Sequence, residues 1–211
     1  MNILLNEIFH SIQGEGPAAG GPAIFVRLSG CNLQCMWCDT KYAWAPEGAR
    51  ELDEIVRAIR KYPCKHLVIT GGEPLLQQTA IAALLKALPE YTTEIETNGS
   101  IACRITGLIE QLNCSPKLKN SGNKPYELKI LPLNKKAIYK FVVGGREDIK
   151  EIKNFIKKYK IPQGRVWLMP EGVTKKAIEK KSKWLVEVCK KEGYNFTTRL
   201  QVLLYGNKRG V

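Results

Sequence analysis

Three cysteines in one short segment, Cys31, Cys35 and Cys38, are the residues of this sequence with the clearest capacity for chemistry. Three and two residues separate them, and they come shortly after the apolar run 23–28. Three thiolates on one loop can bind three of the four irons of a cubane iron-sulfur cluster, and no fourth cysteine is close enough in sequence to complete the set. The fourth iron would then be open to a small molecule, whereas a cluster with four cysteine ligands mainly transfers electrons.

A structural zinc site is the simplest alternative for these cysteines. Zinc in such sites has four ligands, usually arranged as two pairs. The other candidate ligands are scattered singly along the chain: Cys64, Cys103, Cys114, Cys189, His10 and His66. Because no second pair is present, the spacing favours an iron-sulfur cluster over zinc.

A glycine-rich turn, Gly71-Gly72-Glu73-Pro74, follows the apolar run 66–70. Two glycines let a backbone approach a ligand closely, Glu73 supplies hydrogen-bond acceptors, and Pro74 can begin a helix. Such a turn is by itself more often a strand-to-helix connection than a binding site. Its place one strand after the cysteine segment makes it a candidate ligand-binding turn.

Short apolar runs and amphipathic helical patterns alternate along most of the chain. The runs that we predict to be buried strands are 23–28, 66–70, 92–97, 109–114, 137–143 and 165–169. The helical patterns are 51–61, 77–88, 147–158 and 175–191. A short edge strand at 7–9 and a last strand within 194–205 are also expected. This order predicts a parallel sheet covered by helices.

The predicted fold class is α/β, an incomplete and open (β/α)6 barrel in which residues 1–211 form one domain. Six repeats in about 150 residues are too few for a closed eight-stranded barrel, which takes about 250 residues. Three more polar segments, 96–99, 114–117 and 169–172, follow predicted strands. Active sites of barrels and open α/β sheets assemble at such strand ends, so the pattern indicates an enzyme. A doubly wound sheet would place these segments similarly.

The formal charge of +13 raises the question of a nucleic-acid partner. The lysines of 150–160 and 175–191 alternate with apolar residues at helical spacing, which is typical of solvated helix faces, and we find no nucleic-acid-binding motif. The first residues lack the features of a secretory signal, and no run approaches about 18 apolar residues. With an odd number of cysteines, seven, the sequence predicts a cytoplasmic protein in a reducing compartment, with no membrane partner.

Four segments resemble one family from end to end: Ile8–Gly16, Phe25–Leu28, Trp37–Thr40 and the tail Arg199–Val211. They are similar to the 7-carboxy-7-deazaguanine synthases of the radical S-adenosylmethionine (SAM) superfamily, whose signatures are a CxxxCxxC loop and a GGEP turn. The resemblance implies conversion of 6-carboxy-5,6,7,8-tetrahydropterin to 7-carboxy-7-deazaguanine with loss of ammonia, on the route to queuosine or archaeosine. It also implies a [4Fe-4S] cluster, SAM, Mg2+, a flavodoxin- or ferredoxin-type electron donor, and a homodimer.

The resemblance further implies roles for individual residues. The metal ligands would be Cys31, Cys35 and Cys38 for the cluster and Thr40 for Mg2+. SAM would contact Trp37, Cys38, Asp39, Gly72, Ser115, Pro116, Lys117, Met169, Pro170, Glu171 and Gly172. The pterin would contact Ile12, Gln13, Gly14, Arg27, Thr70 and Val211. No side chain is expected to carry out the radical chemistry itself, which the cofactors perform.

Three details add to this assignment. The family often has Gln-Pro where this chain has Met169-Pro170, which favours a backbone contact there. For Glu96 and Asn98 we expect only a position at the mouth of the site. Arg27 suits the substrate carboxylate because its planar guanidinium can bind a carboxylate through two hydrogen bonds.

Three other functions stay open at the level of sequence. A radical SAM activase would share the cysteine motif but would leave the segment 13–16 and the basic tail without a purpose. A non-catalytic iron-sulfur or zinc protein would need a fourth ligand and would not bind SAM. A tRNA-binding protein would show binding that falls steeply with salt.

Overall fold

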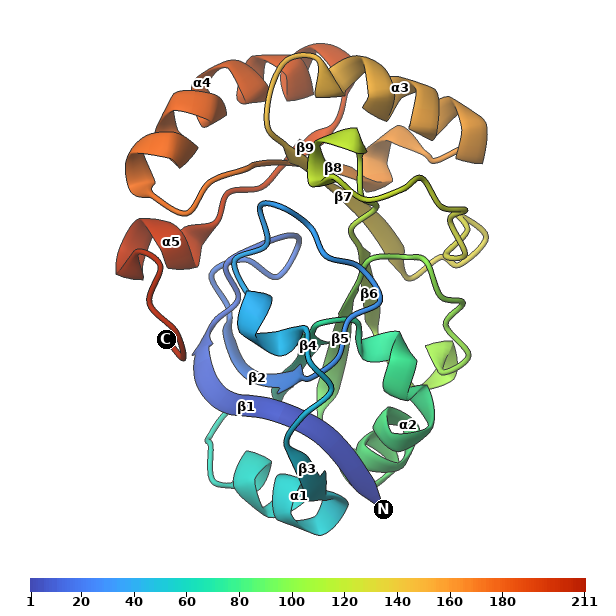
Figure 1. Cartoon of the computed structure of the whole chain (residues 1–211), viewed down its shortest axis with the longest axis vertical. Coiled ribbons are helices and arrows are strands. Elements are labelled where there is room, and N and C mark those ends of the chain that lie inside the picture. Colours follow the sequence, from blue (N-terminus) through green and yellow to red (C-terminus); the bar gives the residue numbers. More distant parts are fainter.

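One sheet contains all nine strands in the computed structural model, which describes residues 1–211 (Figure 1). The strands are β1 (Asn2–Ile12), β2 (Pro22–Leu28), β3 (Ala49–Glu51), β4 (His66–Gly71), β5 (Thr92–Thr97), β6 (Gln111–Cys114), β7 (Ala137–Val143), β8 (Val166–Pro170) and β9 (Asn195–Phe196). Their order is β3-β1-β2-β4-β5-β6-β7-β8-β9. From β2 onward neighbours are parallel and follow the order of the chain, whereas β1 is antiparallel to both β2 and β3. The sheet does not close, so the predicted open (β/α)6 architecture is confirmed.

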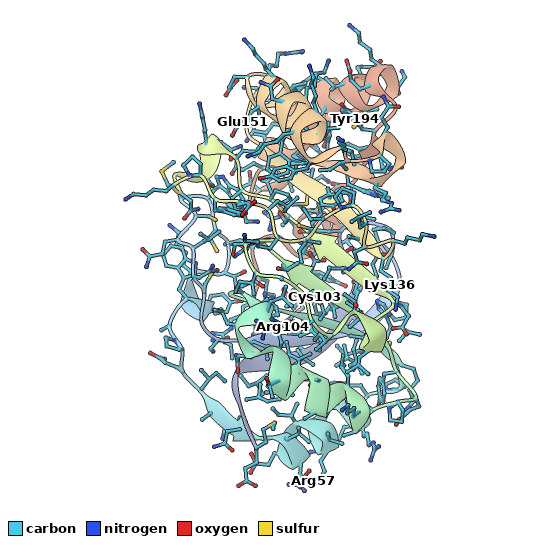
Figure 2. All side chains as sticks on the ribbon, turned by 90° about the vertical axis from the view of Figure 1, so that its right-hand side faces the viewer. Arg57, Cys103, Arg104, Lys136, Glu151 and Tyr194 are labelled. Atoms are coloured by element: carbon cyan, nitrogen blue, oxygen red, sulfur yellow. The ribbon has the colours of Figure 1, made fainter.

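Five α-helices accompany the sheet: α1 (Leu52–Arg60), α2 (Gln78–Lys86), α3 (Asp148–Tyr159), α4 (Lys175–Glu192) and α5 (Leu200–Tyr205). Figures 1 and 2 show α1 at one end of the molecule and α3 and α4 at the other. Local signals set the bounds of α4, because the Thr174 hydroxyl accepts a hydrogen bond from Ala177 N and Gly193 takes the left-handed conformation after the last turn. None of the helices is long and apolar enough to cross a membrane.

The core lies between the sheet and these helices. Strand β7 is buried along its whole length, as expected for a parallel strand covered on both faces, and Tyr139 and Phe141 are fully buried. Burial of such large side chains provides most of the free energy that holds the sheet and the helices together. The sheet is therefore a rigid frame for the loops at its carboxyl edge.

Most predicted elements agree with the structure to within a few residues, and 137–143 agrees at both ends. The helix predicted at 77–88 starts as a 3-10 turn, Pro74–Gln77, before α2. The strand predicted at 109–114 begins only at Gln111. No α-helix follows β5 or β6, and the segment 115–136 after β6 contains only one 3-10 turn, Lys119–Ser121.

Two predictions about the ends of the chain are wrong in extent or type. The strand expected at 7–9 is the much longer β1; β3 pairs with its residues 2–4, whereas residues 7–9 pair only with β2 and lie at the edge of the sheet, as predicted. The strand expected within 194–205 is reduced to β9, and 200–205 is the helix α5. A short apolar run is compatible with either structure, and here Val202 is buried on one side while Gly206 ends the helix.

Candidate active site

A cavity of about 520 Å³ lies at the carboxyl edge of the parallel strands. Its walls come from β1 and the turn after it, the cysteine segment, the loops after β4 to β6, strand β8, and the C-terminal tail. Polar segments that are far apart in the sequence therefore meet in one place. This is the site expected for an α/β enzyme.

The three cysteines of the motif are free thiols that line this cavity, whereas the other four cysteines do not. Each sulfur accepts one N–H hydrogen bond: Cys31 from Leu33 N at 3.4 Å, Cys38 from Thr40 N at 3.4 Å, and Cys35 from the side chain of Asn123 at 3.1 Å. Donors of this kind stabilise thiolates that bind iron. Three sulfurs with donors on one cavity wall thus fit a cubane cluster with one open iron.

The side chains of this structure form no closed zinc site. Nowhere in the chain do three cysteine, histidine or carboxylate side chains converge closely enough to bind a single ion. A mononuclear structural site needs four such ligands on one metal, whereas each cysteine of a cubane binds a different iron.

The glycine-rich turn after β4 presents its backbone to the cavity through Gly71 and Gly72. Gly71 has φ +140°, and a Cβ on Gly72 would collide with the backbone carbonyls of Gly30 and Ala43. Both positions therefore require glycine. Glu73 is 1% exposed and does not line the cavity.

The carboxylate of Glu73 instead holds the neighbouring strand end in place. It accepts hydrogen bonds from Asn98 N at 2.7 Å, Leu75 N at 2.9 Å and the Thr97 hydroxyl at 2.8 Å. Burial raises the pKa of Glu73 in spite of these donors. This side chain fixes the ends of β4 and β5 relative to each other, and the ligand-facing part of the turn is backbone.

All six residues expected to contact the pterin line the cavity: Ile12, Gln13, Gly14, Arg27, Thr70 and Val211. Arg27 is paired, as expected for an inward-facing arginine, but its partner is a protein carboxylate. Arg27 Nε lies 2.7 Å from Glu7 Oε1, and Glu7 also accepts from Arg209 Nε at 2.8 Å. The C-terminal tail is therefore tied to β1 through the same carboxylate that holds Arg27.

Eight of the eleven residues expected to contact SAM line the cavity: Trp37, Cys38, Asp39, Gly72, Ser115, Lys117, Met169 and Glu171. The other three, Pro116, Pro170 and Gly172, do not. Lys117 Nζ donates to Ser115 Oγ at 2.8 Å and lies 5.4 Å from the centre of the Trp37 ring. The Gly172 carbonyl accepts a hydrogen bond from Arg199 at 2.6 Å.

Thr40, the expected Mg2+ ligand, also lines the cavity. Its hydroxyl donates to Asp39 Oδ1 at 2.7 Å. A hydroxyl beside a carboxylate is an oxygen-only environment of the kind that Mg2+ prefers, and this ion retains several waters.

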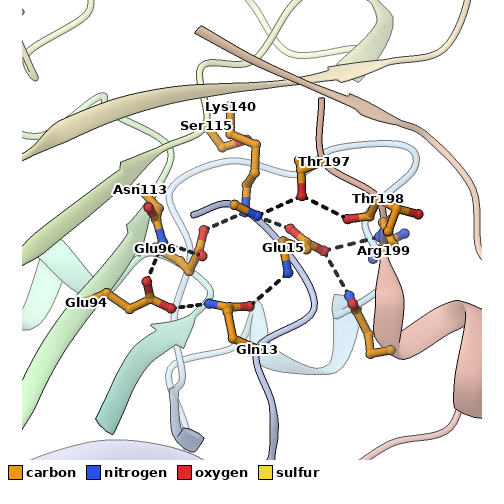
Figure 3. A network of polar contacts seen from close by, with 12 residues as sticks. Gln13, Glu15, Glu94, Glu96, Asn113, Ser115, Lys140, Thr197, Thr198 and Arg199 are labelled. Carbon is orange, nitrogen blue, oxygen red and sulfur yellow. Dashed lines mark hydrogen bonds and ion pairs between the residues drawn. The ribbon is translucent and has the colours of Figure 1, made fainter. Parts of the chain in front are cut away.

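Lys140 is not among the site residues expected from the sequence. Its side chain is 3% exposed, lines the cavity and lies between Glu15 and Glu96 (Figure 3). Lys140 Nζ is 2.7 Å from Glu15 Oε2 and 2.9 Å from Glu96 Oε2. Glu15 also pairs with Arg199, at 3.3 Å, and accepts from Gln201 Nε2 at 2.9 Å. A lysine inside the otherwise apolar strand 137–143 was the one sequence signal that pointed to this network.

The charges of this network set the protonation states of its members. Burial would raise the pKa of Glu15, but Lys140 and Arg199 outweigh burial and lower this pKa to about 2. Burial raises the pKa of Glu96, although Lys140 acts in the opposite direction. Burial would lower the pKa of Lys140, and the two carboxylates overcome it and raise the pKa. Lys140 therefore stays charged between two glutamates of unequal acidity.

Glu96 is also oriented from the side of the sheet. Asn113 Nδ2 donates to Glu96 Oε1 at 3.0 Å and to Glu94 Oε2 at 3.1 Å, and Gln13 donates to Glu94 (Figure 3). Arg199 in turn forms an ion pair with Asp39 beside the cysteine segment. Strand β1, the sheet interior, the cysteine segment and the tail are thus linked by one polar network.

Comparison with known proteins agrees with this geometry. The sequence pattern of the Radical SAM superfamily matches residues 25–185. The chain is 37% identical to a 7-carboxy-7-deazaguanine synthase of Pyrobaculum aerophilum, over 97% of this chain and 95% of that protein, and 34% identical to one of Rhodopirellula baltica, over 99% and 89%. The crystal structure of QueE from Escherichia coli has a TM-score of 0.75 and 27% identity, covering 95% of each chain.

Proposed function

This chain belongs to the radical SAM superfamily and, within it, to the 7-carboxy-7-deazaguanine synthases, and we propose that its cavity converts 6-carboxy-5,6,7,8-tetrahydropterin to 7-carboxy-7-deazaguanine with release of ammonia. One observation is the main support for this proposal. The cysteine segment, the glycine turn, Arg27 and the C-terminal tail all line one cavity, so that a cluster, SAM and a pterin can meet there. When bound, the [4Fe-4S] cluster and SAM supply the radical that removes a hydrogen atom from the substrate.

Residues at the outer end of the cavity hold the cofactors in this proposal. Cys31, Cys35 and Cys38 bind the cluster. The Gly71-Gly72 backbone receives SAM, for which the absence of side chains leaves room. Thr40 would contribute one oxygen to a bound Mg2+, an ion that usually retains several waters.

Arg27 binds the substrate carboxylate in this scheme. Its guanidinium is already paired with Glu7, and the planar fork of an arginine suits a second carboxylate as well. The substrate therefore either joins Glu7 on Arg27 or displaces it. Because Glu7 also holds Arg209 of the tail, substrate binding is coupled to the position of the tail.

Lys140, Glu15 and Glu96 form a fixed polar floor beneath the substrate. These groups are held by ion pairs and side-chain amides, so they need no reorganisation when a polar ring replaces water above them. The tail residues 206–211 cover the other side of the cavity and limit access of water to it.

The proposal also covers the domain organisation, the oligomeric state, the location and the electron donor of the protein. We infer one radical SAM domain over residues 1–211, a homodimer, a cytoplasmic location, and a reducing protein of the flavodoxin or ferredoxin type as the electron source. The continuous sheet supports the single domain. A family enzyme needs a small-molecule substrate and a reductant, and neither a nucleic acid nor a membrane is required as a stable partner.

The test uses anaerobically purified protein with a reconstituted cluster. We expect an EPR signal of a reduced [4Fe-4S] cluster that changes when SAM is added, and formation of 7-carboxy-7-deazaguanine and ammonia from 6-carboxytetrahydropterin. If the cluster responds to SAM but no product forms, the radical SAM function is retained and the proposed pterin substrate is refuted. A cluster that does not respond to SAM would refute the radical SAM function.

A further inference from the structure

Asn123 is the one side chain that donates a hydrogen bond to a cysteine of the CxxxCxxC segment. Its Nδ2 lies 3.1 Å from Cys35 Sγ, although the two residues are 88 positions apart in the sequence. Asn123 belongs to the segment 115–136, which follows β6 and lies against the cysteine loop. Met36 N donates to Ser121 O at 2.9 Å, which holds the two segments together beside this contact.

The orientation of the Asn123 amide is fixed by its neighbours. Gln34 N can only donate, and it points to Asn123 Oδ1 at 3.1 Å. The nitrogen end of the amide must therefore face Cys35. Its two protons are directed to Cys35 Sγ and to Ser121 Oγ, each at 3.1 Å, so the N–H to sulfur contact does not depend on an arbitrary choice of amide rotamer.

The other two cysteines of the motif receive their hydrogen bonds from the loop itself. Leu33 N and Thr40 N, each two residues after the cysteine that it contacts, are backbone donors. Cys35 is the most buried of the three, with 7% of its surface exposed, and its donor is a side chain from another part of the chain.

We propose that Asn123 is a positioning residue for the iron-sulfur cluster, and that its N–H bond to Cys35 raises the reduction potential of that cluster. This proposal rests on the proposed function, because it takes Cys35 as a cluster ligand. A cluster that accepts one electron from the reductant carries more negative charge on its sulfurs. A hydrogen bond to a ligand sulfur is therefore stronger in the reduced state and favours reduction.

The experiment is an EPR-monitored redox titration of the protein with its reconstituted cluster, without SAM. Asn123→Leu keeps the approximate size of the side chain and removes the N–H donor to Cys35 together with the acceptor of Gln34 N. We expect an equilibrium constant for one-electron reduction about tenfold lower than in the wild type, which is a midpoint potential about 59 mV more negative. Ser121→Ala is the matched control, because it removes the other partner of the amide and leaves the bond to Cys35; its potential stays at the wild-type value.

Asn123→Asp is the second variant, since its carboxylate still accepts from Gln34 N but has no N–H for the sulfur. We expect its potential to fall further than that of Asn123→Leu, because its added negative charge also disfavours reduction of the cluster. Equal potentials in all four proteins, or the same shift in Ser121→Ala as in Asn123→Leu, would overturn the proposal. Loss of the cluster from both Asn123 variants would also overturn it, because Asn123 would then serve assembly of the loop. A wild-type protein without a [4Fe-4S] signal would instead refute the proposed function.

Discussion

Replacement of Lys140 by methionine tests whether the polar floor of the cavity is held by charge. Methionine matches the length and the apolar stem of lysine, so the packing of β7 is largely preserved. The variant lacks the cation that lies 2.7 Å from Glu15 and 2.9 Å from Glu96. Glu15 keeps Arg199 as a partner, whereas Glu96 has no other ion pair.

The expected loss of stability follows from burial. Lys140 is 3% exposed and its partners are 16% and 19% exposed, so solvent screens the pairs only weakly. Removing one partner of a buried ion pair costs about 3–5 kcal/mol, because the remaining charge is uncompensated. For a chain of this length 1 kcal/mol shifts the Tm by about 2–4 °C, so we expect Lys140→Met to lower the Tm by roughly 6–20 °C.

The variant also has a characteristic pH dependence. Burial already raises the pKa of Glu96 above its ordinary value, and loss of Lys140 raises it further. A carboxyl whose folded pKa is raised stabilises the protein fully at low pH and loses this contribution as the pH rises through the folded pKa. We therefore expect Lys140→Met to recover part of its Tm relative to the wild type when the pH is lowered from 8 toward 5.

Glu15 acts in the opposite sense in the wild-type protein. Its folded pKa of about 2 lies below the ordinary value of 4.5, so its contribution is complete above 4.5 and is lost as the pH falls toward 2. Glu15 therefore gives the wild type no gain in Tm between pH 8 and 5.

Thermal unfolding followed by circular dichroism at pH 8, 6.5 and 5 measures both effects. Lys190→Met is the matched control, because Lys190 pairs with Glu187 and both side chains are 66% exposed. An exposed pair contributes at most about 1 kcal/mol, so this control lowers the Tm by less than about 4 °C. The reasoning is refuted if the two variants lose the same Tm, or if Lys140→Met gains nothing at pH 5 relative to the wild type.

Three further predictions concern the turn, the tail and the cysteines. Gly72→Ala should lower the Tm and weaken SAM binding in calorimetry, because the added Cβ collides with backbone carbonyls. Gly107→Ala is the control and should leave both quantities unchanged, because a Cβ at Gly107 has no atom within 4 Å. Arg199 anchors the start of α5 through charged hydrogen bonds to Glu15, Asp39 and Gly172, and Arg199→Met removes them. We expect amide hydrogen exchange in α5 to become about tenfold faster or more, and unchanged exchange would contradict this anchoring role. Cys38→Ser should abolish the iron-sulfur absorbance and Cys64→Ser should retain it, since Cys38 lines the cavity and Cys64 does not.

Several features could be predicted from the sequence because they depend on neighbouring residues. The predicted and observed bounds of β7 are the same, because 137–143 is a continuous apolar run in which only Lys140 is charged. The helix α4 could be predicted from its period and from Gly193. The cysteine spacing places three thiols on one loop independently of the tertiary structure of the rest of the chain.

Other features depend on distant contacts and could not be predicted. The run 200–205 has the composition of a short strand, but it forms α5, in which Val202 is buried and lines the cavity, and it does not pair with β9. Arg27 could be expected to face inward, but the carboxylate opposite it, Glu7, is chosen by the register of β1 against β2, in which the two residues are paired.

The sequence by itself therefore determined the family, the α/β order of elements and the identity of the candidate ligands, since these reside in short motifs and local periodicity. The tertiary structure decided which groups surround them. Lys140 meets Glu15 across 125 positions, Arg199 meets Glu15 across 184, and Asn123 reaches Cys35 across 88. The Lys140 and Arg199 pairs form because segments far apart in the sequence line one cavity, and a charge buried there is stabilised only when it has a partner.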